Sequence, residues 1–113
     1  MFAVLSPAKR LNEPPAVREL PHSKPCLMAD AVELMDTAKT LSRSELKNLM
    51  SISDKLADLN WQRFHDFGLP FTPSNARQSV LCFNGDTYVG LDASTLSEAN
   101  LAYAQEHLGI LSG

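Results

Sequence analysis

Cysteine is scarce in this sequence, which has only Cys26 and Cys82 among 113 residues. Two cysteines form no disulfide framework, and neither has a second Cys or His at metal-ligand spacing. Both lie in mostly apolar stretches with helical periodicity, where we expect small buried thiols in a reducing compartment. This cysteine usage favours a cytoplasmic protein and predicts no metal site.

Long hydrophobic runs are also lacking. The longest, residues 2–5 and 79–83, are far below the roughly 18 residues that a membrane span needs. The first basic residues, Lys9 and Arg10, follow the N-terminal apolar residues instead of preceding them, so the start of the chain does not have the pattern of a secretory signal. The sequence therefore predicts neither membrane insertion nor secretion.

The chain has no excess of positive charge. Ten Lys and Arg against thirteen Asp and Glu give a formal net charge of −3, with an isoelectric point of about 5.5. A uniformly basic surface for nucleic acid is excluded, so a site for a polyanion must be local. Residues 1–24 and 39–63 each carry a net charge of +2, whereas residues 25–38 and 64–113 carry −3 and −4.

An apolar content of 44% and a charged content of 20% are typical of one globular domain. Periodicity predicts an α+β fold that is mostly helical, with about five helices and a few short strands. We expect a buried strand at 1–5 and a long connection at 7–25, which holds five of the seven prolines. The expected helices are 26–41, 43–50, a third from about 54 to before 68, 73–83, and 96–109, with extended segments at 87–90 and from 110.

The last residues of the sequence influence the domain organisation that we expect. Because it stops on the first residues of an apolar extended segment, we expect 1–113 to be the N-terminal portion of a larger single-domain fold, cut short at 113. The short strands would then lack partners within the chain. Exposed apolar surface would favour self-association of the fragment.

Residues 43–64 have the spacing of a helix-hairpin-helix element. In that motif two helices are joined by a tight Gly-hydrophobic-Gly hairpin, and a small residue four positions later lets the helices approach closely. Here Ser51 and Ser53 replace the glycines and Ala57 is the small residue. The amides of such a hairpin and the dipole of the second helix favour a phosphate. The predicted DNA-binding residues are Lys47, Ser51, Ile52, Ser53, Lys55 and Arg63.

A purely structural interpretation of the same residues remains open. The serines cap helices in any αα-hairpin, and Asp54 and Asp58 would repel a phosphate at the start of the second helix. If DNA binds here, the contacts hold the backbone without reading the bases, so binding is non-specific and salt-dependent.

A second candidate site lies directly after the first strand. Ser6 and Lys9 offer a hydroxyl and an ammonium at a strand end, where ligands of α/β sheets collect, so we consider them a possible anion or ligand site. The glycine-containing segment 83–91 matches neither a P-loop nor a dinucleotide fingerprint and is interpreted as a turn into a short strand. No nucleophile with a base partner emerges, so no catalytic residue and no cofactor are predicted.

With these residues identified, the sequence resembles the N-terminal part of the YaaA family of peroxide stress proteins. The resemblance rests on motifs in order along the chain, namely 6–9 (SPAK), 53–57 (SDKLA), 60–64 (NxxRF), 75–78 (NARQ), 83–91 (FNGDTYVGL) and 111–113 (LSG). It implies a longer, cytoplasmic bacterial protein that limits damage from hydrogen peroxide. It also implies lower free intracellular iron and DNA binding through a helix-hairpin-helix and a positively charged cleft.

Three functions remain in competition. The first is a DNA-binding protein of the oxidative stress response, with DNA as its partner and no membrane. The second is an enzyme acting on nucleic acid bases or nucleotides near Ser6 and Lys9. The third is a structural or interaction domain whose residues only maintain the fold.

Overall fold

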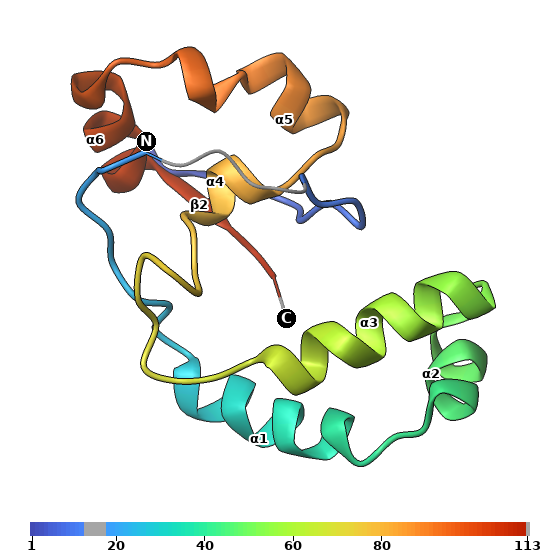
Figure 1. Cartoon of the computed structure of the whole chain (residues 1–113). Helices are drawn as coiled ribbons and strands as arrows, with labels where there is room; N and C mark the ends of the chain where they lie inside the picture. Colours follow the sequence, from blue (N-terminus) through green and yellow to red (C-terminus); the bar gives the residue numbers. More distant parts are fainter. Residues whose placement is uncertain (13–17, 113) are drawn as a thin grey trace. The chain divides into compact units, whose positions relative to one another are not determined.

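The computed structural model describes residues 1–12 and 18–112, and within them it confirms an α+β, mostly helical fold. The chain divides into two compact units, Ser23–Phe71 and the combination of Met1–His22 with Thr72–Gly113. The first unit is helical and contains α1 (Met28–Lys39), α2 (Arg43–Met50) and α3 (Asp54–Asp66) (Figure 1). The described part of the second unit contains two strands and four short helices in the order β1 (Ala3–Leu5), α4 (Ser79–Cys82), α5 (Asp86–Leu91), the 3-10 helix η1 (Ala93–Thr95), α6 (Glu98–His107) and β2 (Leu108–Ile110).

The start of α2 is fixed by a capping box, which Ser42 and Glu45 form at the Ser-x-x-Glu spacing that the sequence contains. The amide of Glu45 donates to the hydroxyl oxygen of Ser42 over 3.3 Å, and the Glu45 carboxylate accepts from the Ser42 amide over 2.8 Å. These bonds from Ser42 hold the pKa of Glu45 below its usual value, because they stabilise the charged carboxylate. The predicted bounds of α2 are therefore confirmed at both ends.

The core of the helical unit lies between α2 and α3. Leu46 and Ala57 are 1% and 2% exposed, and the two helices that carry them pack against each other. The methyl side chain of Ala57 lets the backbones approach, as the predicted motif requires. At the outer edge of the pair, Arg43 contacts Asp58 over 2.7 Å and its guanidinium lies 3.9 Å from the centre of the Trp61 ring. Together these contacts join the first turn of α2 to the middle of α3.

The other unit contains a two-stranded parallel sheet, so the expectation that the strands lack partners is wrong. Residues 3, 4 and 5 of β1 pair with residues 108, 109 and 110 of β2. The expected burial of the first strand is also wrong, since Phe2 and Val4 are 61% and 51% exposed. Parallel pairing places the carboxyl ends of both strands at one edge, where the Leu111 amide donates to the Leu5 carbonyl over 3.0 Å.

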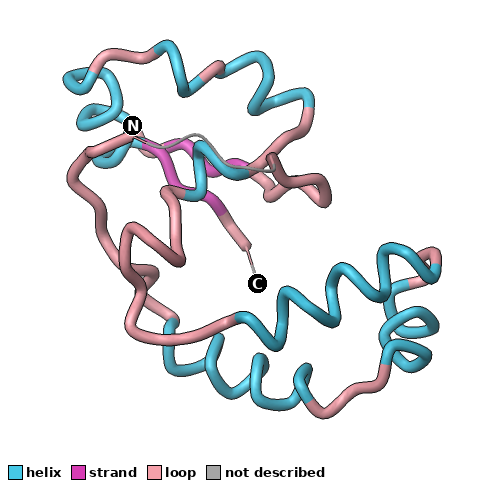
Figure 2. Tube along the Cα trace, in the orientation of Figure 1, coloured by secondary structure: helices cyan, strands magenta, loops and turns pink. Residues whose placement is uncertain are grey.

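The helix predicted at 73–83 is confirmed only as the single turn of α4. Figure 2 draws the stretch before α4 as loop. The amides of Asn75 and Ala76 both donate to the Thr72 carbonyl, which closes a turn early. The guanidinium of Arg77 then bonds to the carbonyls of Pro73 and Ala76. These bonds take up carbonyls that a longer helix would use, and the helix begins only after residue 78.

The extended segment predicted at 87–90 is wrong, because these residues form α5. Gly85 is extended and its carbonyl accepts from the amides of Tyr88 and Val89, each over 2.9 Å. The glycine turn therefore leads into a helix and not into the predicted short strand.

The last helix is shorter than predicted at both ends. Thr95, directly before the predicted start at 96, belongs to η1, and the hydroxyl of Ser97 caps α6 by accepting from the Asn100 amide over 3.2 Å. The helix ends at His107 because Leu108 enters β2. Gly109, the predicted end of this helix, instead pairs with Val4 of β1.

We predict that Ala57→Leu lowers the free energy of unfolding by about 1–3 kcal/mol, because the added methylenes force α2 and α3 apart. Ala31→Leu, on an exposed part of α1, is the matched control and is expected to change stability by less than about 0.5 kcal/mol. Urea denaturation followed by circular dichroism measures both. Equal stability of the two variants would contradict close packing at Ala57.

Candidate functional site

The connection between α2 and α3 gives its two serines different roles. Ser51 has a φ of 52° and lies in the left-handed region, and its amide donates to the Lys47 carbonyl. The Ile52 amide donates to the same carbonyl over 3.2 Å. Ser51 therefore holds the conformation that favours the first glycine of the predicted motif. Ser53 is extended and needs no glycine, and its hydroxyl accepts from the Leu56 amide over 3.3 Å to cap α3.

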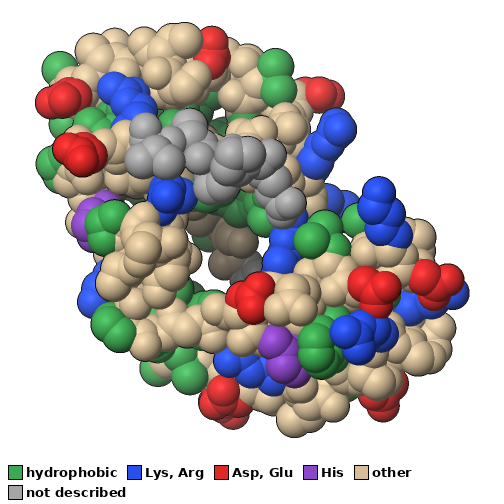
Figure 3. Space-filling model, in the orientation of Figure 1, with side chains coloured by type: hydrophobic (Ala, Val, Ile, Leu, Met, Phe, Trp, Pro, Cys, Tyr) green, Lys and Arg blue, Asp and Glu red, His purple; other side chains and the backbone are tan. Residues whose placement is uncertain are grey.

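The charges around this connection are mixed. Lys47 in the last turn of α2 contacts Asp54 in the first turn of α3 over 2.7 Å, so the charge of Lys47 is partly neutralised. Lys55 is exposed beside them. Figure 3 shows acidic and basic side chains interspersed over the visible surface of α2 and α3. The cations on this surface are local and do not form a continuous basic face.

Arg63 is the predicted site residue that lies farthest from the connection. It stands in the last turn of α3, eight residues after Lys55, which is about 12 Å along the helix axis. The structure therefore brings the residues from Lys47 to Lys55 together and leaves Arg63 at the other end of the same helix.

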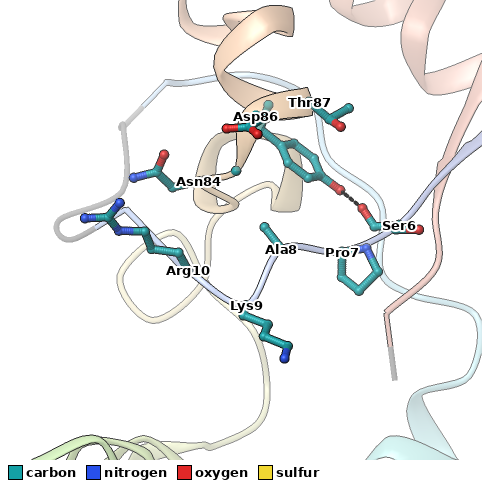
Figure 4. Close-up of a pocket in the computed structure, with 10 residues that line it drawn as sticks. Ser6, Pro7, Ala8, Lys9, Arg10, Asn84, Asp86 and Thr87 are labelled. Atoms are coloured by element: carbon teal, nitrogen blue, oxygen red, sulfur yellow. Dashed lines mark hydrogen bonds between the residues drawn. The ribbon is translucent and has the colours of Figure 1, made fainter.

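The second candidate site is a pocket of about 320 Å³ in the unit with the sheet, and both Ser6 and Lys9 line it. One wall is the segment that follows β1, and the other is the start of α5 with the turn before it (Figure 4). The hydroxyl of Tyr88 donates to the Ser6 carbonyl over 2.6 Å, and the Asn84 amide donates to the Arg10 carbonyl over 2.9 Å. Two sequence motifs far apart in the chain thus form one site.

Sequence reasoning missed that the turn at 84–88 faces Ser6. The signal available was the glycine itself: a Cβ built on Gly85 would lie 3.2 Å from the Cβ of Ala8, closer than ordinary contact. Tyr88 is 6% exposed, and burial raises the pKa of its phenol, so the hydroxyl stays protonated and donates at neutral pH. Tyr88 therefore connects the two walls of the pocket.

The remaining reactive side chains form no site among the residues that the structure describes. Cys26 is exposed before α1, contrary to its expected burial, whereas Cys82 is half-buried. Burial raises the pKa of the Cys82 thiol, and the nearby charge of Arg77 partly opposes this. Residues 1–12 and 18–112 contain no group of three His, Cys, Asp or Glu that could hold a metal ion. In the same ranges, every helix is too short or too polar to span a bilayer.

Comparison with known proteins identifies the family. The sequence model described as peroxide stress protein YaaA matches residues 1–113. This chain belongs to the YaaA family. Its relatives include UPF0246 proteins of Alteromonas mediterranea and Burkholderia lata, each 50% identical over 113 residues, and one of Burkholderia cenocepacia, 52% identical over 114 residues. Each match covers all of this chain but only 44% of the relative, so the chain spans less than half the length of these relatives.

Because the two hairpin serines have different roles, we predict that they tolerate different substitutions. Ser51→Gly is expected to be at least as stable as the parent, whereas Ser51→Val is expected to lose about 1–2 kcal/mol because a β-branched residue is strained at positive φ. At Ser53, the capping variant Ser53→Asp is expected to be tolerated and Ser53→Ala to lose about 1 kcal/mol. Urea denaturation of the four variants measures their free energies of unfolding. A higher stability of Ser51→Val than of the parent would contradict the left-handed turn.

Proposed function

We propose that this chain binds the phosphate backbone of DNA through the α2–α3 hairpin and that this binding serves the peroxide stress response of its family. One observation carries the proposal: Ser51 adopts the left-handed conformation at the position where the helix-hairpin-helix motif has its first glycine. The almost fully buried Ala57 supports it, because the motif requires a small residue at that contact.

The hairpin supplies the groups that a phosphate needs. The first-turn amides of α3 have no carbonyl partners within the helix, and the helix dipole makes this end attractive to an anion. Lys55 lies in that first turn with its side chain exposed, and Lys47 stands across the connection from it. A phosphate at the hairpin would therefore meet two cations and the end of a 13-residue helix.

The carboxylate of Asp54 limits this attraction. It occupies the first turn of α3 and contacts Lys47, so it competes with a phosphate for the same cation. Binding is therefore expected to be moderate, independent of base sequence and strongly weakened by salt. The family resemblance also implies that the protein lowers free intracellular iron. The proposal includes this effect, and the resemblance is its only support.

Reversal of charge along α3 tests the proposal. Lys55→Glu combined with Arg63→Glu is expected to abolish binding of a labelled duplex at about 100 mM salt and to lower the slope of log affinity against log salt by about two. The control Lys24→Glu reverses one exposed cation in the same unit, before α1, which is half of the charge change in the double variant. Fluorescence anisotropy across a salt series measures both variants. If the double variant kept the affinity and the salt slope of the parent, the proposal would be contradicted and the hairpin would have only a structural role.

Removal of the competing carboxylate is expected to have the opposite effect. Asp54→Asn frees Lys47 and removes a negative charge from the phosphate site, so duplex affinity should rise several-fold at low salt and the salt slope should steepen by up to about one. Asp66→Asn, in the last turn of α3, is the matched control. The same anisotropy titration measures the effect, and weaker binding by Asp54→Asn would contradict a phosphate at this helix end.

A further inference from the structure

The two-stranded sheet presents one apolar face to solvent. Successive side chains of a strand point to opposite faces, and residues paired in register share a face. Val4 pairs with Gly109, so Phe2 and Leu111, each two positions away along its own segment, lie on the same face. Phe2, Val4 and Leu111 are 61%, 51% and 69% exposed. These three residues and Gly109 form what we call the open face of the sheet.

A close contact within the open face supports this arrangement. A Cβ built on Gly109 would lie 3.0 Å from Cε1 and 3.1 Å from Cζ of Phe2, closer than ordinary contact. The glycine therefore leaves room for the Phe2 ring beside β2, and the ring still remains mostly exposed. The opposite face is better covered, since Leu5, Leu108 and Ile110 are half-buried.

The open face lacks the features of a strand surface that stays in water. Parallel sheets in folded proteins almost always have both faces covered. Strands that remain exposed usually carry charged residues, which prevent further packing. Here, residues 1–8 and 107–113 contain no Asp, Glu, Lys or Arg. Within residues 1–12 and 18–112 the sheet has two strands, and its open face remains uncovered (Figure 2).

The length of the relatives indicates what covers this face. Each match spans all of this chain but 44% of the relative, so more than half of each relative lies outside the match. The fraction of surface that is buried on folding rises with chain length. A chain more than twice as long can therefore cover an apolar face that a chain of 113 residues leaves exposed.

We infer that the open face is an internal interface of the full-length YaaA-family protein. The part of such a protein that lies outside the match to residues 1–113 packs an uncharged, apolar segment on Phe2, Val4 and Leu111. The contact is made within one chain, so a second copy is not the partner. The interface belongs to the unit with the sheet, and the DNA binding proposed for the hairpin does not depend on it.

A chimera tests the inference by comparing one substitution in two settings. In the chimera, this chain replaces the matched region of the Alteromonas mediterranea protein. Val4→Lys in this chain alone is expected to shift the melting temperature by less than about 3 °C, because the side chain is exposed. The same substitution in the chimera is expected to lower it by at least about 10 °C, because the ammonium is buried without a partner. Thermal unfolding followed by circular dichroism measures both.

Two further variants show whether the loss is specific to the open face. Val89→Lys introduces the same charge at a 66% exposed position of α5 in the same unit, and a shift of less than about 3 °C is expected in both proteins. Val4→Thr keeps the β-branched shape and is expected to lower the melting temperature only in the chimera. Equal shifts for Val4→Lys in the two proteins, or an equal loss from Val89→Lys in the chimera, would overturn the inference.

Hydrogen exchange of the natural Alteromonas mediterranea protein gives a second test, which does not depend on folding of the chimera. The amides aligned with residues 3–5 are expected to exchange at least about ten-fold more slowly in that protein than in this chain, because a covered sheet opens less often. Equal exchange rates would overturn the inference.

Sedimentation velocity separates the internal interface from a contact between copies. The natural Alteromonas mediterranea protein and its variant with the substitution aligned with Val4→Lys are compared. A sedimentation coefficient that shows the same oligomeric state for both is expected. A dimer that this substitution converts to a monomer would assign the open face to a second copy and would overturn the inference.

Discussion

The close contact of α2 and α3 at Ala57 is the constraint on which the hairpin depends. Two helices joined by three residues can pack only if the chain reverses at once, and the left-handed Ser51 provides that reversal. Ser53 then starts α3 with a capping hydroxyl. The positions of Lys47 and Lys55 follow from this reversal, because they lie on its two sides. A bulky residue at 57 would therefore disturb the phosphate site as well as the core.

The pocket depends on a different constraint, the parallel pairing of β1 with β2. This pairing fixes where the chain leaves the sheet at Ser6, and Tyr88 then ties the start of α5 to that point. The close approach of Gly85 to Ala8 sets the distance between the walls. The two candidate sites thus have separate origins in separate units, so that each can be altered without the other.

Local signals in the sequence were sufficient for the α2–α3 hairpin. The helix at 43–50 and the small residue Ala57 at the contact with the next helix were both predicted from residues 43–64, and the structure has both. These features depend on residues a few positions apart, whose hydrogen bonds and periodicity can be derived without knowledge of the rest of the chain. The family resemblance likewise rests on contiguous motifs, and it is confirmed.

Long-range contacts account for what the sequence could not show. Residues 3–5 pair with residues 108–110, which are about 100 positions away in the sequence. No local sequence pattern predicts this pairing. The same holds for the pocket, whose walls are about 80 residues apart, as the Tyr88 bond to Ser6 shows. The segment at 87–90 was misassigned because four residues with Val and Tyr suit a strand, whereas the Gly85 carbonyl in the folded chain starts a helix. The predicted connection 7–25 partly lies outside the described residues, at 13–17.

The most direct measurement of the central claim is a titration of the ¹⁵N-labelled chain with a short DNA duplex, followed by amide chemical shifts. If a phosphate binds at the hairpin, the largest shifts are expected on the amides from Lys47 to Lys55, with those of Asp54 and Lys55 in the first turn of α3 foremost, and they are expected to disappear as salt is raised. Shifts concentrated at Ser6–Arg10 and around Tyr88, with the hairpin amides unmoved, would contradict it and place the DNA contact at the pocket.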